Sequence, residues 1–116
     1  MVISLIGSAG KRLIIEPDPA YAHVGSKVEW RLSFDKNYPH PIEWVVYFGH
    51  ATPFKEKEWK AITGLQTVPP SAAGHEGSIA AGTADESGEY KYGVRIVNAN
   101  TGEALSDDDP ILIVTR

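Results

Sequence analysis

Strict alternation of apolar and polar side chains is the feature that most constrains the fold of this chain. In residues 27–35, apolar side chains occupy every second position, and polar or charged side chains occupy the positions between them. Residues 89–97 repeat the pattern. A period of two is typical of a β-strand that buries one face, whereas an amphipathic helix repeats about every 3.6 residues. Both segments therefore predict half-buried strands.

Shorter apolar segments predict the remaining strands. Residues 42–48 carry one apolar face and one partly apolar face, which indicates a strand whose second face is covered in part. Residues 12–16, around the apolar run 13–15, and residues 111–114 are short segments with continuous apolar runs, typical of buried strands. Weaker signals predict strands in four further segments, at residues 2–6, 21–24, 65–68 and 78–81.

Residues that favour turns separate these segments at short intervals. Two prolines within residues 16–19 exclude a central strand or a helix there. Three aspartates before Pro110, in residues 107–110, predict a solvated acidic turn. The middle of the chain is less regular. Residues 54–63 predict either a short helix or a loop followed by a short strand, and residues 64–77 predict a long surface loop.

Seven or eight short strands between such turns predict an all-β fold, an antiparallel β-sandwich. The 116 residues are the length of one domain, so we expect a single domain over residues 1–116. The formal net charge of −4 lacks the basic excess of nucleic-acid binders, which we exclude as partners. No segment approaches the roughly 20 apolar residues of a membrane span, and the start lacks the pattern of a signal peptide. We expect a soluble chain and assign it no compartment.

Three segments resemble cupredoxin-like domains. Residues 16–34 (EPDPAYAHVGSKVEWRLSF) are similar to the cupredoxin opening, in which a strand ends at a proline and a short strand enters a turn before an alternating strand. Residues 39–48 (PHPIEWVVYF) resemble the segment in which a histidine precedes a valine-rich strand, and residues 87–94 (SGEYKYGV) resemble the strand that enters the copper loop. The resemblance implies a Greek-key sandwich of cupredoxin-like type. Immunoglobulin-like sandwiches alternate in the same way and remain the alternative.

The same resemblance matches His40 to the first copper ligand by its placement. A type 1 copper site also needs a second imidazole, a thiolate and usually a thioether. In the family, these ligands lie in the loop after the Tyr-x-Tyr strand. Here residues 95–110 (RIVNANTGEALSDDDP) contain no Cys, His or Met, and the chain contains no cysteine at all. Blue-copper electron transfer is therefore excluded by residue type, as are disulfides, and we expect no cofactor.

A different metal site would have to use other histidines, of which His40, His75 and His50 are weak candidates. The predicted strand at residues 42–48 separates His40 from His50 by up to about 33 Å. His75 lies in the predicted loop, from which it can approach either one. We expect no metal site, and we keep a divergent metal-binding protein that uses His40 with His75 or His50 as the alternative function.

No motif supports catalysis, because no spacing pairs a nucleophile with a base or two carboxylates across a cleft. We therefore expect that the chain is not an enzyme. Six aromatic residues fall on inward strand positions, where a core accounts for them: Trp30, Phe34, Trp44, Phe48, Tyr90 and Tyr92.

Four other aromatic residues have no core assignment: Tyr38, Tyr47, Phe54 and Trp59. Exposed Trp and Tyr are typical anchors of protein interfaces, so these four are our partner-binding candidates, flanked by Lys55, Lys57 and Lys60. The alternative is that they pack beneath the loop at residues 64–77 or on the second face of the sheet. The sequence predicts a non-catalytic binding or structural module that acts on an unidentified protein partner or by self-association.

Overall fold

The computed structural model describes residues 1–63 and 75–116, and within these ranges the chain forms strands and loops but no helix. The strand segments are β1 (Val2–Gly7), β2 (Ile14–Glu16), β3 (Ala20–His23), β4 (Lys27–Phe34), β5 (Ile42–Tyr47), β6 (Glu58–Thr63), β7 (His75–Thr83), β8 (Gly88–Lys91), β9 (Gly93–Asn98), β10 (Ala104–Asp108) and β11 (Ile111–Thr115). Three of them, β3, β9 and β11, continue the preceding segment after a short break. The all-β fold that the alternation predicts is confirmed.

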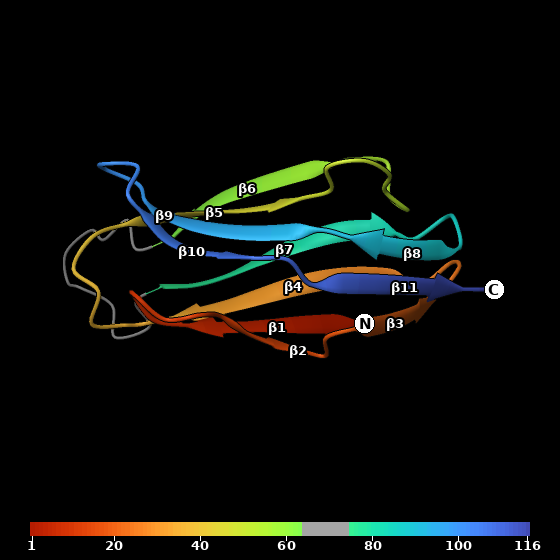
Figure 1. Ribbon diagram of the computed structural model, residues 1–116, viewed down its shortest axis with the longest axis horizontal. Helices are drawn as coiled ribbons and strands as arrows, with labels where there is room; N and C mark the ends of the chain where they lie inside the picture. Colours follow the sequence, from red (N-terminus) through yellow and green to blue (C-terminus); the bar gives the residue numbers. More distant parts are fainter. Residues whose placement is uncertain (64–74) are drawn as a thin grey trace.

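The strands form two layers that pack face to face (Figure 1). One layer is the sheet β2-β1-β4-β7, and the other combines the sheets β10-β9-β5-β6 and β3-β11-β8. The latter two sheets share the interrupted strands β8/β9 and β10/β11. At the interruption, the backbone N–H of Tyr92 donates to the carbonyl oxygen of Pro110 at 3.1 Å. The two short sheets therefore act as one layer of a β-sandwich.

The sandwich contains two parallel pairs, so the expectation of a wholly antiparallel fold is wrong. β1 runs parallel to β4, and β3 runs parallel to β11. A parallel pair needs a crossover connection, because a hairpin reverses the chain. The connection from β1 to β4 passes through β2 in the first layer and then through β3 in the second. Residues 17–19, with their two prolines, form the break between β2 and β3.

The apolar side chains of the alternating segments form the core of the sandwich. In β4, Val28, Trp30, Leu32 and Phe34 are all buried, and all six aromatic residues assigned to the core from their positions are buried too. Burial of an apolar side chain of this size contributes about 1.5–3 kcal/mol relative to exposure. A slip of one residue would expose this whole set, so the alternation also fixes the register of the strand.

The structure decides between the two alternatives for the irregular middle of the chain. Residues 58–63 are strand β6, which pairs with β5 along its whole length, so the loop followed by a short strand is confirmed and the helix is wrong. Trp59, Ala61 and Thr63 face inward on this strand, and the residues between them are exposed. Of the loop expected at residues 64–77, the last three residues belong to β7. Residues 64–74, which include the strand expected at 65–68, lie outside the described residues.

The acidic segment is also more ordered than a solvated turn. Asp107 and Asp108 end strand β10, where they pair with Arg95 and Val94 of β9. Asp108 is buried. The sequence pattern misses this strand because its residues, ALSDD, contain few side chains that favour strands.

Candidate functional site

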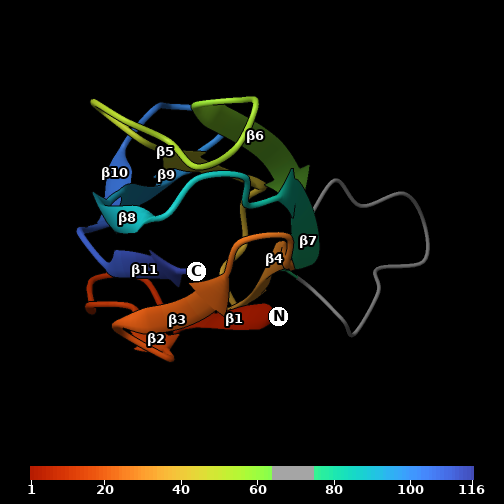
Figure 2. The same ribbon diagram turned by 90° about the vertical axis from the view of Figure 1, so that its right-hand side faces the viewer.

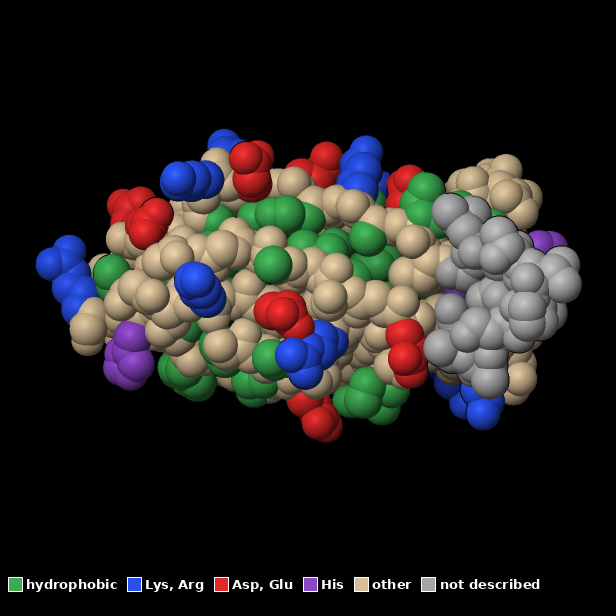
Figure 3. Space-filling view, turned by 180° about the vertical axis from the view of Figure 1, so that it is seen from behind, with side chains coloured by type: hydrophobic (Ala, Val, Ile, Leu, Met, Phe, Trp, Pro, Cys, Tyr) green, Lys and Arg blue, Asp and Glu red, His purple; other side chains and the backbone are tan. Residues whose placement is uncertain are grey.

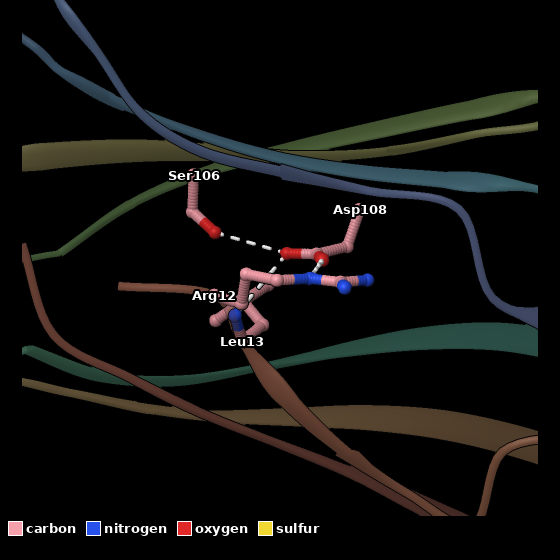
Figure 4. Close-up of polar contacts among 4 residues, drawn as sticks. All are labelled: Arg12, Leu13, Ser106 and Asp108. Carbon is pink, nitrogen blue, oxygen red and sulfur yellow. Dashed lines mark hydrogen bonds and ion pairs between the residues drawn. The ribbon is translucent and has the colours of Figure 1, made fainter. Parts of the chain in front are cut away.

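A buried carboxylate joins the two layers along one side of the sandwich, where β2 and β10 lie. The Asp108 side chain is only 6% exposed. One of its oxygens accepts the backbone N–H of Leu13 at 3.2 Å and the hydroxyl of Ser106 at 3.0 Å, and the other lies 3.3 Å from Nε of Arg12 (Figure 4). Leu13 precedes β2 in one layer, whereas Asp108 ends β10 in the other. These hydrogen bonds therefore close this side.

On the opposite side, the edges of β6 and β7 face each other and are joined at two points (Figure 2). At one end, Oγ1 of Thr63 lies 3.4 Å from Nδ1 of His75. Beyond the other end, the backbone N–H of Asp85 donates to the carbonyl oxygen of Pro53 at 2.8 Å. Between these two points there is a cleft of about 620 Å³, which we call the Trp59 cleft.

The lining of the Trp59 cleft combines one aromatic side chain with small and charged ones. It consists of Lys55, Glu56, Trp59, Ala80, Ala81, Gly82, Thr83 and Asp85. Figure 3 views this side of the molecule and shows apolar side chains along its middle with charged side chains around them. An apolar centre with a polar rim is the usual arrangement of a binding surface. The cleft also has the size of typical ligand sites, about 300–1,000 Å³.

Trp59 is held in place by aromatic side chains on its inner side. Its ring centroid lies 5.4 Å from that of Trp30, 5.6 Å from that of Phe54 and 5.9 Å from that of Phe48. The rings meet at tilted or edge-to-face angles, which their quadrupoles favour. Trp30 is fully buried, whereas Trp59 remains partly exposed. Trp59 therefore offers an ordered aromatic surface to the cleft.

A β-bulge shapes the opposite wall of the cleft. The register of β7 against β4 shifts between the pairs Val28–Gly82 and Glu29–Ala80, which leaves Ala81 as the extra residue. Gly82 has a φ of 92°, a conformation that favours glycine. Bulges bend the strand that carries them and occur often at sheet edges and beside binding sites. The bulged residues are those that line the cleft.

The charges at the rim of the cleft are not neutralised by ion pairs within residues 1–63 and 75–116. Lys55 and Glu56 lie on the β6 side and Asp85 on the β7 side, and none of the three belongs to an ion pair there. All three are exposed. The rim carries two carboxylates and one ammonium group, which favours a ligand with a positive charge.

Two of the other partner-binding candidates lie away from the surface of the cleft. Phe54 is 6% exposed and packs against Trp30 and Phe48, so it supports Trp59 from below. Tyr38 is half-buried at the other end of the sandwich, where its hydroxyl accepts the side-chain N–H of Asn98 at 3.1 Å.

Tyr47 lies on the outer face of β5, where its own neighbours hold it. It is the cross-strand partner of Gly93, where an added Cβ would overlap its ring. The guanidinium of Arg95 lies 5.3 Å from the ring centroid, and the Tyr47 hydroxyl donates to Asp107 at 3.2 Å. Burial and the nearby Asp107 carboxylate raise the pKa of Tyr47 above its usual value. Gly93 thus marks a close approach of the Tyr47 ring to the backbone of β9.

The structure brings His40 and His75 to the same end of the sandwich but leaves His50 elsewhere. Their rings lie 5.7 Å and 6.0 Å from that of Tyr38. His75 is buried, and its Nε2 donates to the carbonyl oxygen of Tyr38 at 2.8 Å, so a neutral ring has only Nδ1 as an acceptor, facing Thr63. Among the described residues, no three His, Cys, Asp or Glu side chains gather as metal ligands would.

A second hollow, of about 540 Å³, lies on the outer face of β1, β4 and β7. Its lining includes Ile6, Arg31 and Glu76 but no aromatic side chain. Trp and Tyr are the residues that most often dominate binding energy. The Trp59 cleft is therefore the better candidate site.

The fold is a β-sandwich whose layers are joined by Asp108 on one side and separated by the Trp59 cleft on the other. The chain matches no known protein-family model, and no curated protein matches it. Within the described residues, no helix is long and apolar enough to cross a membrane.

Proposed function

We propose that this chain is a non-catalytic binding module that acts through protein contacts at the Trp59 cleft. The observation that carries the proposal is the partly exposed ring of Trp59, backed by Trp30, Phe48 and Phe54, beside three charged side chains that form no ion pair within the part of the chain that the structure describes. A rigid aromatic anchor binds at a low cost in conformational entropy, and the polar rim adds specificity. Sequence alone already selected Trp59 and the lysine Lys55 beside it.

We further propose that the sandwich is of the Greek-key, cupredoxin-like type. The positions of the strands support this. β2 ends where the first proline follows, β3 enters the turn at Gly25 and Ser26, and the alternating strand β4 comes next. The other two segments that carry the resemblance are residues 39–48, which contain strand β5, and residues 87–94, which contain β8 and the start of β9. Blue-copper electron transfer is no part of this proposal, because the chain has no cysteine to supply the thiolate.

The binding function can be tested by recording amide NMR spectra during titration with a fragment library. The library contains small aromatic compounds, short apolar peptides and disaccharides. We expect the responding signals to be those of the Trp59 indole and of residues 80–85, and we expect Trp59→Ala to abolish the responses. Tyr21→Ala is the matched control, because Tyr21 is 63% exposed on β3 but lies outside the cleft. Responses that map elsewhere, or that persist in Trp59→Ala, would contradict the proposal.

The alternative function, a divergent metal-binding protein that uses His40 with His75 or His50, is supported by one observation, for the first pair: the rings of His40 and His75 both lie near that of Tyr38. The hydrogen bonds of His75 would have to break first, which makes this the weaker candidate. Calorimetric titration with Cu²⁺ or Zn²⁺ separates the two functions. A tight stoichiometric site that His40→Ala abolishes would favour metal binding over the module proposed here.

A further inference from the structure

The edge of β7 beside the cleft carries no charged side chain and no proline, and the β-bulge at Ala81 is the one feature there that interrupts it. In the described residues, β7 pairs with β4 alone, and its other edge is joined to β6 only near His75. The edge residues 80–83 are Ala, Ala, Gly and Thr, without a charge or a proline. Proteins commonly protect exposed edges with charged side chains, prolines or bulges, because unpaired backbone groups attract another strand.

The edge of β6 across the cleft is different. The exposed residues Glu58 and Lys60 lie along this strand, and Nζ of Lys60 is 4.0 Å from Oε2 of Glu58. Charged side chains therefore lie beside the unpaired backbone of β6. The structure therefore places charges along the edge of β6, whereas the edge of β7, which is uncharged over residues 80–83, is interrupted only by the bulge at Ala81 beside Trp59.

We propose that the partner of this module enters the Trp59 cleft as an extended peptide, which pairs through its backbone with the edge of β7. This inference rests on the binding function proposed above. One apolar side chain of the peptide lies against Trp59, and a basic side chain lies near Glu56 and Asp85. Backbone hydrogen bonds supply affinity in this mode of recognition, and the pockets for alternate side chains supply specificity.

The dimensions of the site agree with this occupant. The open edge from Ser78 to Thr83 spans about 20 Å when extended, which is the length of a short strand. The cleft of about 620 Å³ holds only part of such a peptide, so one or two side chains enter it while the backbone follows the edge. Charge complementarity selects the basic residue, because Glu56 and Asp85 together outweigh Lys55 at the rim.

The test uses a blocked hexapeptide, Thr-Val-Leu-Lys-Val-Thr, and two versions of it with N-methyl groups on alternate backbone nitrogens. Alternate N–H groups of a strand point to the same side, so one methylated version loses its donors to β7 and the other keeps them. We expect the parent and one version to shift the amide signals of residues 78–83 and the Trp59 indole signal. The other version should bind at least about tenfold more weakly, since two or more hydrogen bonds are lost.

A second experiment uses Asp85→Asn to test the contribution of the rim charge. Only the backbone of Asp85 bonds to Pro53, so the variant keeps that contact while it removes one charge. We expect a loss of about threefold in affinity for the lysine peptide, by analogy with other exposed ion pairs, and none for a version with norleucine in place of lysine. Asp109→Asn, exposed and outside the cleft, is the control.

The outcomes separate this inference from the proposed function. If both methylated peptides bind as well as the parent, the cleft recognises side chains alone and strand pairing is wrong. If fragments bind the cleft but the peptide does not, or if the peptide pairs with β6, strand addition to β7 is again wrong while the binding module stands. If neither the peptide nor any fragment reaches Trp59, both proposals fail.

Discussion

At the scale of single residues, Gly93 shows how a missing side chain organises a face of the sheet. The ring of Tyr47 lies where a larger residue at Gly93 would place its Cβ. Arg95 and Asp107 complete the contacts of the ring and of its hydroxyl. Tyr47 is therefore part of the scaffold of the outer face as well as a candidate for partner contacts.

Gly93→Ala should lower the free energy of unfolding by about 1–3 kcal/mol, because the added methyl group overlaps the Tyr47 ring. Urea unfolding measures the change. In a Tyr47→Ala background the same substitution should cost clearly less, since the clashing ring is gone. Gly49→Ala is the control, because nothing lies within 4 Å of a Cβ at that position. Equal costs in both backgrounds would contradict the contact.

Tyr92 makes the free energy of unfolding depend on pH in the alkaline range. Burial is the main cause that raises its pKa from 10.0 to about 12. The unfolded chain loses this proton near pH 10, whereas the folded chain keeps it until about pH 12. The stability that Tyr92 contributes is therefore complete below pH 10 and decreases by about 2–3 kcal/mol as the pH rises to 12.

Denaturant unfolding at several alkaline pH values tests this dependence against Tyr92→Phe. The variant removes the acceptor for the indole N–H of Trp30, which lies 3.3 Å away, so we expect lower stability at every pH. Between pH 10 and 12, the free energy of unfolding of Tyr92→Phe should decrease less than that of the parent protein. Parallel curves for the two proteins would show that Tyr92 does not carry the dependence.

At the scale of structural elements, Asp108 fixes the segment that connects β1 with β2. Asp108→Ala leaves the N–H of Leu13 without its acceptor and should lower the free energy of unfolding by about 2–4 kcal/mol. Trypsin should also cleave faster after Lys11 or Arg12, since the segment is released. Asp109→Ala, at the exposed neighbour, should change stability by less than about 0.5 kcal/mol. Similar effects of the two substitutions would contradict the role of Asp108.

The sequence predicts the elements whose own pattern decides their structure. β4 and β8/β9 alternate clearly, β5 has one apolar and one partly apolar face, and all of them form where the pattern predicts. The sequence of β6 is ambiguous, because the apolar residues of 54–63 fit the helical period of about 3.6 residues as well as the strand period of two. Pairing with β5 is what makes residues 58–63 a strand. β10 is missed because its aspartates favour turns in isolation, whereas Asp108 is stabilised by Leu13, 95 positions away in the chain.

At the scale of the whole molecule, the two sides of the sandwich differ in how they close. Asp108 seals the side of β2 and β10, while β6 and β7 separate between the Thr63–His75 and Pro53–Asp85 contacts. The sequence indicates Trp59 as a contact residue but not the cleft itself. The cleft depends on two edges that are distant along the chain and on the bulge at Ala81. A glycine within the strand, Gly82, is the one local signal for that bulge.

Fluorescence quenching by acrylamide tests most directly whether this side is open in solution. Trp30 and Trp44 are fully buried, whereas Trp59 faces the cleft. We predict that acrylamide quenches the emission of the parent protein and quenches that of Trp59→Phe much less. Tyr21→Phe should be quenched like the parent. Weak quenching of the parent, or equal quenching after Trp59 is replaced, would mean that the cleft is closed and that the proposed binding site does not exist.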